Sequence, residues 1–422
     1  MSNIIMYMLP LVVTPILTRL YTPEAFGEWG VFSSFVAIVT ICIFCGFENV
    51  IIQAKIDELP QIINLCVITS LCSIAVISII MRVGIIEGIH FFADFPNPCI
   101  LIVYLLFYAI YTILYNIANR FELYYTLSFA NIVQGGSQAV FRITLAFACL
   151  QTINGLILGT TIAQGCTAIF ILFFLLRKNI MNLCTERSLT KIKQLASSYR
   201  NFPLYDAPAS VLSFAAFNLP VIILSFYFEK ATIGCFSIVL QLLLMPMSLV
   251  GSAMGKVYYQ RISADCSSIE KTTKEMMKII TIISVLPMLF IACGGDKLIV
   301  LFLGSQWESA GKVALCLSLW SFPTILTQPF LPLFRVKNKQ STLLFFDILY
   351  FILGIGCILI SCQLTTNLYI ILIVFSSACF IVKSVLFLGI VSTSGLKNYS
   401  YTKAIPLWAI SLTFLTLRLI SI

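Results

Sequence analysis

The feature that most constrains this chain is a series of apolar runs of about 20 residues that recur along almost its whole length. Only helices and closed barrels satisfy their backbone hydrogen bonds inside lipid, and a spanning helix needs runs of this length. The mean hydropathy is +1.01 and 10% of the residues are charged, whereas about 25% are charged in an ordinary soluble domain. The sequence therefore predicts an all-α integral membrane protein.

Twelve such runs fall into two groups of six on either side of a polar, basic stretch. They occupy residues 4–18, 30–52, 62–86, 99–118, 129–150, 155–176, 204–228, 233–253, 279–294, 313–334, 342–362 and 368–390. We expect a six-helix bundle over residues 1–176, a cytoplasmic loop over 177–202, a second six-helix bundle over 203–391 and a tail over 392–422. A shorter thirteenth run at 404–422 contains Arg418, and it either spans the membrane or lies at its interface.

The distribution of basic residues predicts the orientation. The chain has 26 lysine and arginine residues and a net charge of +9. If the N-terminus is cytoplasmic, most of them fall in cytoplasmic loops, as the positive-inside rule requires. The positive charge then reflects membrane topology, and nucleic acid is not an expected partner. The opening run has no basic leader and no cleavage pattern, so it reads as a retained first span.

The two halves also resemble each other. A Leu-Pro pair lies within the first run of each half, at Leu9-Pro10 and at Leu219-Pro220, and Gly27 and Gly234 follow at similar distances. Transporters are often built from structural repeats around a shared site. The match predicts two bundles related by a pseudo-two-fold repeat.

Several kinds of chemistry have no residues to carry them. His90 is the only histidine, the 15 cysteines lie mostly within apolar runs, and no phosphate-binding loop is present. We therefore expect no metal centre, no cofactor and no ATP hydrolysis.

Charged side chains inside spans are costly and are functional candidates by default. Arg142 is the clearest, because Asn131, Gln134 and Gln138 share its helix face at spacings of 3, 4 and 4 residues. This face predicts a water-filled cavity in which the guanidinium binds a phosphate. The alternative is a structural ion pair or a bond to backbone carbonyls.

The fourth run carries an aromatic stripe, and other polar residues lie near span ends. Tyr104, Tyr108, Tyr111 and Tyr115 either stack on sugar rings or pack between helices. Lys383 is a second candidate cation, with snorkelling to the interface as its alternative. Three carboxylates are candidates for binding a coupling proton or Na⁺, or else form structural pairs; they are Glu48, Asp206 and Asp347.

Three stretches carry a resemblance to a known family. They are Leu9-Pro10, Thr14-Pro15-Ile16-Leu17-Thr18-Arg19-Leu20-Tyr21-Thr22-Pro23-Glu24 and Phe26-Gly27; Tyr199-Arg200-Asn201-Phe202-Pro203-Leu204-Tyr205 with Asn218-Leu219-Pro220; and Leu301-Phe302-Leu303-Gly304 with Trp307 and Ala310-Gly311. This pattern resembles the Wzx-type polysaccharide flippases of the multidrug/oligosaccharidyl-lipid/polysaccharide exporter superfamily. The twelve-span layout fits across essentially the whole chain.

The resemblance implies a multi-pass flippase of the bacterial inner membrane with a cationic cavity between two bundles. Its substrate would be a polyprenyl-pyrophosphate-linked oligosaccharide, such as an O-antigen or capsule repeat unit of lipopolysaccharide or polysaccharide biosynthesis, moved outward by alternating access. Polysaccharide polymerase and chain-length proteins are implied partners. Family cavities are basic, and Arg142, Lys383 and Arg19 are the residues that qualify here.

Two other functions are open on sequence grounds. One is a cation-coupled drug or metabolite extruder with the same fold. The other is a membrane polymerase or glycosyltransferase that acts on lipid-linked sugars, but such enzymes usually carry a sizeable outer loop, and the longest loops here are cytoplasmic and basic. The sequence thus favours a transporter over an enzyme.

Overall fold

The structure is a computed structural model that describes residues 2–88, 91, 95–96, 98–148, 154–178, 180, 189–265 and 269–396. Its regular structure is helical throughout these ranges, with no strand among them. Two compact units divide the chain, Met1–Asn218 and Leu219–Ile422. The prediction of an all-α fold is confirmed. The thirteenth run at 404–422 and His90 lie outside the described residues.

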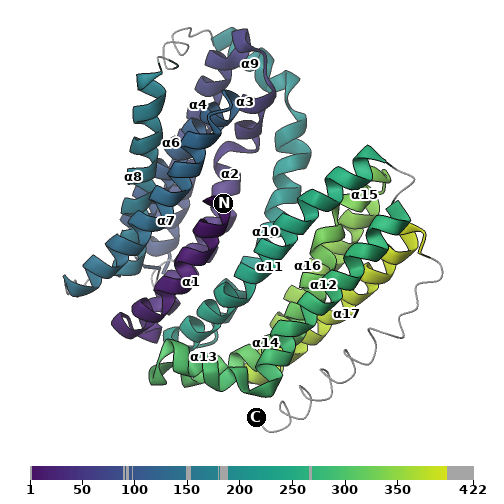
Figure 1. The fold of residues 1–422 in the computed structure, drawn as a ribbon. Helices are drawn as coiled ribbons and strands as arrows, with labels where there is room; N and C mark the ends of the chain where they lie inside the picture. The colour runs from purple at the N-terminus through teal and green to yellow at the C-terminus, as the bar shows by residue number, and fades with distance from the viewer. Residues whose placement is uncertain are drawn as a thin grey trace. The chain divides into compact units, whose positions relative to one another are not determined.

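Six long helices build the first unit (Figure 1). They are α1 (Ser2–Leu20), α2 (Pro23–Phe44), α4 (Leu59–Ile86), α6 (Pro98–Arg120), α7 (Tyr124–Phe147) and α8 (Gly155–Arg177). Helix α8 packs against both α6 and α7, and α1 packs against α7. Local caps fix two of the starts: the Thr22 hydroxyl accepts a hydrogen bond from the Ala25 amide, and Asn154 Oδ1 accepts one from the Leu156 amide at 3.0 Å.

The basic stretch between the two groups of six contains a further helix, α9 (Leu189–Ser198), which packs on α4. Just after it, the Tyr199 hydroxyl donates to Glu58 Oε2 at 3.2 Å. A π-turn, η4 (Phe202–Asp206), then leads into α10 (Ala207–Leu224), the helix in which the chain passes from the first unit to the second.

Five further long helices follow in the second unit (Figure 1): α11 (Lys230–Ala264), α12 (Ile269–Phe290), α14 (Glu308–Thr327), α16 (Gln340–Leu364) and α17 (Leu368–Ser394). Shorter segments join them: η6 (Ile291–Gly295), α13 (Asp296–Leu303), η7 (Ser305–Trp307), η8 (Gln328–Phe330) and α15 (Pro332–Val336). Helix α14 packs against α11, α12 and α17 and is almost entirely buried. It is therefore the central helix of this unit.

Nine helices of the described residues are long and apolar enough to cross a membrane, or ten if α12 and the bent segment after it form one span. Helices α1 and α7 also have spanning length, with 19 and 24 residues, or about 28 and 36 Å. In α7 the polar face that carries Arg142 lowers the hydropathy. The layout of about twelve spans is thus supported.

The structure corrects two expected segments. We expected a span over residues 30–52, but α2 ends at Phe44 because Cys45 and Gly46 adopt left-handed conformations, with φ of 51° and 83°. Glu48 therefore lies beyond the helix, in the 3₁₀ turn η1 (Phe47–Asn49), and not inside a span. The expected span over 279–294 begins earlier, at Ile269, and breaks near Gly294, where φ is 111°.

Candidate functional site

Arg142 is buried inside the first unit, with 6% of its surface exposed. Its Nη2 donates a hydrogen bond to Thr160 Oγ1 on α8 at 2.8 Å, and its guanidinium carbon lies 4.8 Å from the centre of the Trp29 ring on α2. The ring face is negative, so this contact stabilises the cation. No carboxylate pairs with it among the described residues, and its Nε has no hydrogen-bond partner there.

Two glycines of α8 make room for this arginine and for the tyrosine that contacts it. A Cβ on Gly159 would lie 2.8 Å from Arg142 Cγ and 2.9 Å from its backbone nitrogen, and a Cβ on Gly155 would overlap the Tyr21 hydroxyl. That hydroxyl donates to the Arg142 carbonyl at 2.7 Å. Glycines four residues apart let α7 and α8 approach closely, as in other membrane helix pairs.

The polar face of α7 is brought against α8. Gln134 Nε2 donates to Gln164 Oε1 at 2.9 Å, and Gln164 is 3% exposed. Asn131 and Gln138 are half-buried on the same helix. The polar face of α7 that the sequence predicted is thus extended by Gln164 of the neighbouring helix.

The tyrosine stripe of α6 forms a continuous ladder. Successive ring centres from Tyr104 to Tyr115 lie 6.3, 6.5 and 5.5 Å apart, and all four rings pack against the apolar core of this unit. Tyr104 also makes an edge contact with Phe32 and lies within electrostatic range of Arg142. The structure therefore brings one end of the ladder close to the buried arginine.

Lys383 is a second buried cation, on α17 in the second unit, and it is 8% exposed. Its Nζ lies 4.5 Å from the centre of the Tyr350 ring, and the Tyr350 hydroxyl accepts a hydrogen bond from Trp320 Nε1 at 2.8 Å. Asp347, one turn before Tyr350 on α16, is within electrostatic range of Lys383. This burial contradicts the alternative in which Lys383 snorkels to the interface.

Glu48 and Asp206 are brought together at one end of the first unit. Asn49 Nδ2 donates to Asp206 Oδ2 at 3.2 Å, and Asn116 Nδ2 donates to the Glu48 carbonyl at 3.1 Å. Glu48 Oε2 is buried and lacks a hydrogen-bond partner among the described residues. Burial and the nearby Asp206 charge raise the pKa of Glu48 to about 7.

The remaining candidate, Arg19, lies exposed in the last turn of α1. No group of three His, Cys, Asp or Glu side chains that could hold a metal occurs in the described ranges. Sequence reasoning did not identify Trp29, Thr160 or Gln164, which contact the α7 face from other helices. It could have identified Gly155 and Gly159, since their four-residue spacing in an apolar run is a known helix-packing pattern.

Comparison with known proteins agrees with this architecture. The family model described as "Polysaccharide biosynthesis protein" matches residues 16–312. No curated protein matches the sequence significantly. Among solved structures, the lipid II flippase MurJ in an inward-closed conformation has a TM-score of 0.76 at 13% identity, covering 99% of this chain and 91% of that one.

An inward-facing multidrug resistance transporter of the MATE family, from the MOP superfamily, has a TM-score of 0.69 at 15% identity and covers 94% of this chain and 96% of that one. At such identities the likeness shows the fold alone. The family match spans well over half of the chain and confirms the resemblance found in the sequence. The protein is therefore a member of the polysaccharide biosynthesis protein family, and its helices have the fold of MOP-superfamily transporters.

Proposed function

We propose that this protein is a flippase that carries a polyprenyl-pyrophosphate-linked oligosaccharide, an O-antigen or capsule repeat unit, from the cytoplasmic to the periplasmic leaflet of the bacterial inner membrane. It works by alternating access with a cytoplasmic N-terminus, and it hands its product to a polysaccharide polymerase and chain-length proteins. Family membership and the basic cytoplasmic loops support this assignment.

Arg142 is the observation that carries the proposal. A guanidinium has five N–H donors, yet Arg142 makes one side-chain hydrogen bond to the described residues and has no carboxylate partner among them. A buried cation held mainly by one aromatic ring and one hydroxyl is suited to an anionic ligand. We assign it to the pyrophosphate, which offers several oxygens for bidentate hydrogen bonds.

The other polar candidates are assigned to the saccharide and to the second bundle. Asn131, Gln134 and Gln138 offer amides on the same face as Arg142, and the ladder of Tyr104, Tyr108, Tyr111 and Tyr115 offers rings and hydroxyls for sugar faces. Lys383 and Arg19 supply further positive charge.

Glu48 and Asp206 are proposed to bind a coupling H⁺ or Na⁺. A carboxyl group whose pKa is raised to about 7 changes protonation near neutral pH, and Asp206 lies beside it on the turn that opens α10. Asp347 is proposed to play the corresponding role beside Lys383.

The test is complementation in a strain that lacks this gene and any second flippase. The wild-type chain should restore long-chain surface polysaccharide, and Arg142→Ala should fail to do so at equal membrane abundance. Each lost charge-assisted hydrogen bond is worth about 1.5–3 kcal/mol, so a loss of about 10- to 100-fold in transport rate is expected. The matched control is Arg82→Ala, since Arg82 is exposed on α4.

Two outcomes would contradict the proposal. Normal surface polysaccharide in the deletion strain would show that the lipid-linked oligosaccharide is not the substrate. Unchanged polysaccharide together with altered drug tolerance would favour a cation-coupled extruder; the MATE structure of the same fold is named as a multidrug resistance transporter.

A further inference from the structure

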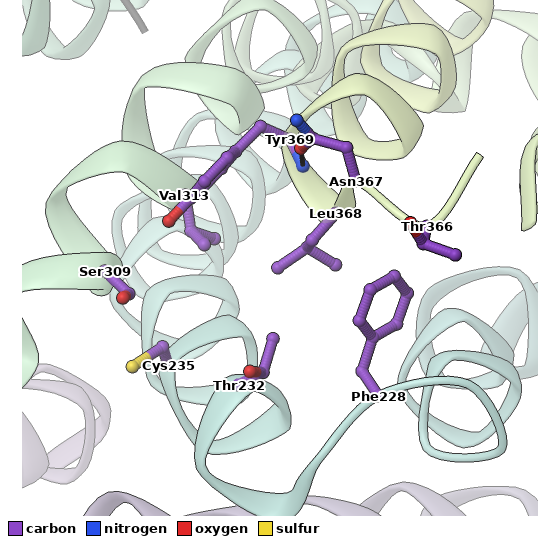
Figure 2. A pocket seen from close by; sticks show the side chains of 9 residues that line it. All are labelled: Phe228, Thr232, Cys235, Ser309, Val313, Thr366, Asn367, Leu368 and Tyr369. Carbon is purple, nitrogen blue, oxygen red and sulfur yellow. Dashed lines mark hydrogen bonds between the residues drawn. The ribbon is translucent and has the colours of Figure 1, made fainter.

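A pocket in the second unit takes no part in the function proposed above. It has a volume of about 390 Å³ and lies where α11, α14 and α17 begin (Figure 2). Cavities of about 300–1,000 Å³ are typical of small-molecule sites. The described lysines and arginines at the opposite ends of these helices include Arg261, Arg335 and Lys337. With a cytoplasmic N-terminus, the pocket end of the unit therefore faces the periplasm.

Aromatic side chains line two sides of this pocket. Phe228, just before α11, and Tyr369, in the first turn of α17, approach it from opposite directions, and Leu368 lies between them (Figure 2). Both rings are only partly buried, so their faces remain accessible. Rings in this position stack well on the C–H faces of a sugar.

Uncharged polar groups complete the lining. The hydroxyls of Thr232, Ser309 and Thr366 make no hydrogen bond within the described residues, and each can donate one and accept two. Asn367 Oδ1 caps α17 by accepting from the Tyr369 amide at 2.9 Å, which leaves the Asn367 Nδ2 group as a donor. The pocket therefore presents both donors and acceptors around apolar faces.

The charges around the pocket balance. Glu229 and Lys230 follow Phe228, while Glu308 and Lys312 flank Ser309, and all four are exposed. Lys312 Nζ lies 6.0 Å from the centre of the Tyr369 ring, at the outer limit of a cation–π contact. Because none of the lining residues is charged and these four neighbouring charges cancel, the lining suits an uncharged, hydroxyl-rich ligand better than an anion.

We propose that this pocket binds a neutral sugar unit of the glycan that the protein delivers to the periplasmic side. The inference rests on the proposed function for the source of the sugar, whereas the binding chemistry rests on the pocket alone. The pocket would hold the emerging saccharide after the pyrophosphate has moved across, and so favour outward release over return.

Binding can be measured on the full-length protein in nanodiscs free of sugar-based detergent. Methyl glucoside, methyl galactoside and methyl N-acetylglucosaminide are titrated and followed by saturation-transfer NMR. At least one is expected to bind with a Kd of about 1–10 mM, a typical strength for a single small ligand of this size. Glucuronate should bind more weakly than the neutral glycosides. The proposal would be overturned if no glycoside bound with a Kd below about 1 M, which is 100 times weaker than the weak end of this range.

Variants place the binding in the pocket. Tyr369→Ala and Phe228→Ala should each weaken it at least tenfold, and Tyr369→Phe should retain most of it because the ring face remains. The matched control is Tyr227→Ala, since Tyr227 is an exposed aromatic next to Phe228 that does not line the pocket. Equal binding by Tyr369→Ala and Tyr227→Ala would overturn the assignment, provided both variants keep the thermal stability of the wild type.

Cell assays then test the source of the sugar. If the sugar belongs to the transported glycan, Tyr369→Ala should slow the appearance of surface polysaccharide several-fold. Lost glycoside binding with unchanged polysaccharide would overturn that assignment and point to a free glycan. Arg142→Ala should retain glycoside binding, because Arg142 lies in the other unit. A failure of the proposed flippase function can therefore be told apart from a failure of glycoside binding in the pocket.

Discussion

A single methyl group on α8 should test whether close helix packing holds Arg142 in place. In Gly159→Ala the new Cβ would lie 2.8 Å from Arg142 Cγ and 2.9 Å from its backbone nitrogen. The side-chain carbon could rotate away, but the backbone nitrogen cannot. Ordinary contact begins near 3.4 Å, so α7 and α8 must separate locally by about 0.5 Å.

The magnitude follows from two opposing effects. Overpacking of this kind costs about 1–3 kcal/mol, while replacing glycine by alanine inside a helix gains up to about 1 kcal/mol. The second effect is measured by Gly136→Ala, because a Cβ on Gly136 of α7 meets nothing within 4 Å. The difference in the free energy of unfolding between the two variants, about 1–3 kcal/mol, is therefore the steric cost.

The assay is equilibrium unfolding in mixed micelles, followed by tryptophan fluorescence, together with complementation of surface polysaccharide. Gly159→Ala should be less stable than Gly136→Ala and should transport less, because the clash shifts Arg142 relative to Thr160. Equal stability and equal transport for the two alanine variants would refute the idea that the glycine pair builds the arginine site.

Four further substitutions probe buried residues. Arg142→Met should leave the free energy of unfolding unchanged or raise it by about 1 kcal/mol, since a buried cation without a carboxylate is replaced by an apolar chain of similar length. Transport should be lost, and a fall of more than about 3 kcal/mol in the free energy of unfolding would show that Arg142 is structural. Lys383→Met should likewise be tolerated in unfolding assays, whereas Tyr350→Ala should destabilise by about 3 kcal/mol through the cavity it leaves. Gly46→Ala should destabilise by about 1–2 kcal/mol, because φ is +83° and the Cβ would lie 3.3 Å from the Phe202 carbonyl oxygen.

Much of the fold could be predicted because its determinants are local. A run of about 20 apolar residues predicts a span without knowledge of its neighbours, and the N-caps at Thr22 and Asn154 are of the usual residue types. The end of α2 was missed because apolar residues continue past it to Ile52. Gly46 in that stretch was the available signal, since glycine commonly follows the end of a helix.

The candidate site was predictable only in part, because its partners come from other helices. The spacing of Asn131, Gln134, Gln138 and Arg142 predicted one face, and the structure keeps that face together. The spacing does not reveal that Trp29 and Thr160 contact the guanidinium, since helix register and rotation are set by packing between segments far apart in the chain. The roles assigned to these residues stay predictions.

The pH dependence of folding should reveal whether Glu48 is as strongly perturbed as its surroundings indicate. Its carboxyl group lies in the connection between two spans and faces Asp206, and Cys45, Cys66 and Tyr108 are further titratable groups within its electrostatic range. Its folded pKa is about 7 against 4.5 for a free side chain. The folded state therefore retains a proton that the unfolded chain releases.

The sign of the effect follows directly. The stabilising contribution of Glu48 is complete below pH 4.5 and is lost as the pH rises through 7, by up to about 3 kcal/mol. Glu48→Gln keeps the shape and never ionises, so the wild type should lose stability relative to this variant between pH 5 and pH 8. Asp206→Asn, which can still accept the bond from Asn49, should move the midpoint of that loss to lower pH. Parallel stability curves for the wild type and Glu48→Gln would show that the carboxylate is solvated, and would remove Glu48 as a proton-coupling residue.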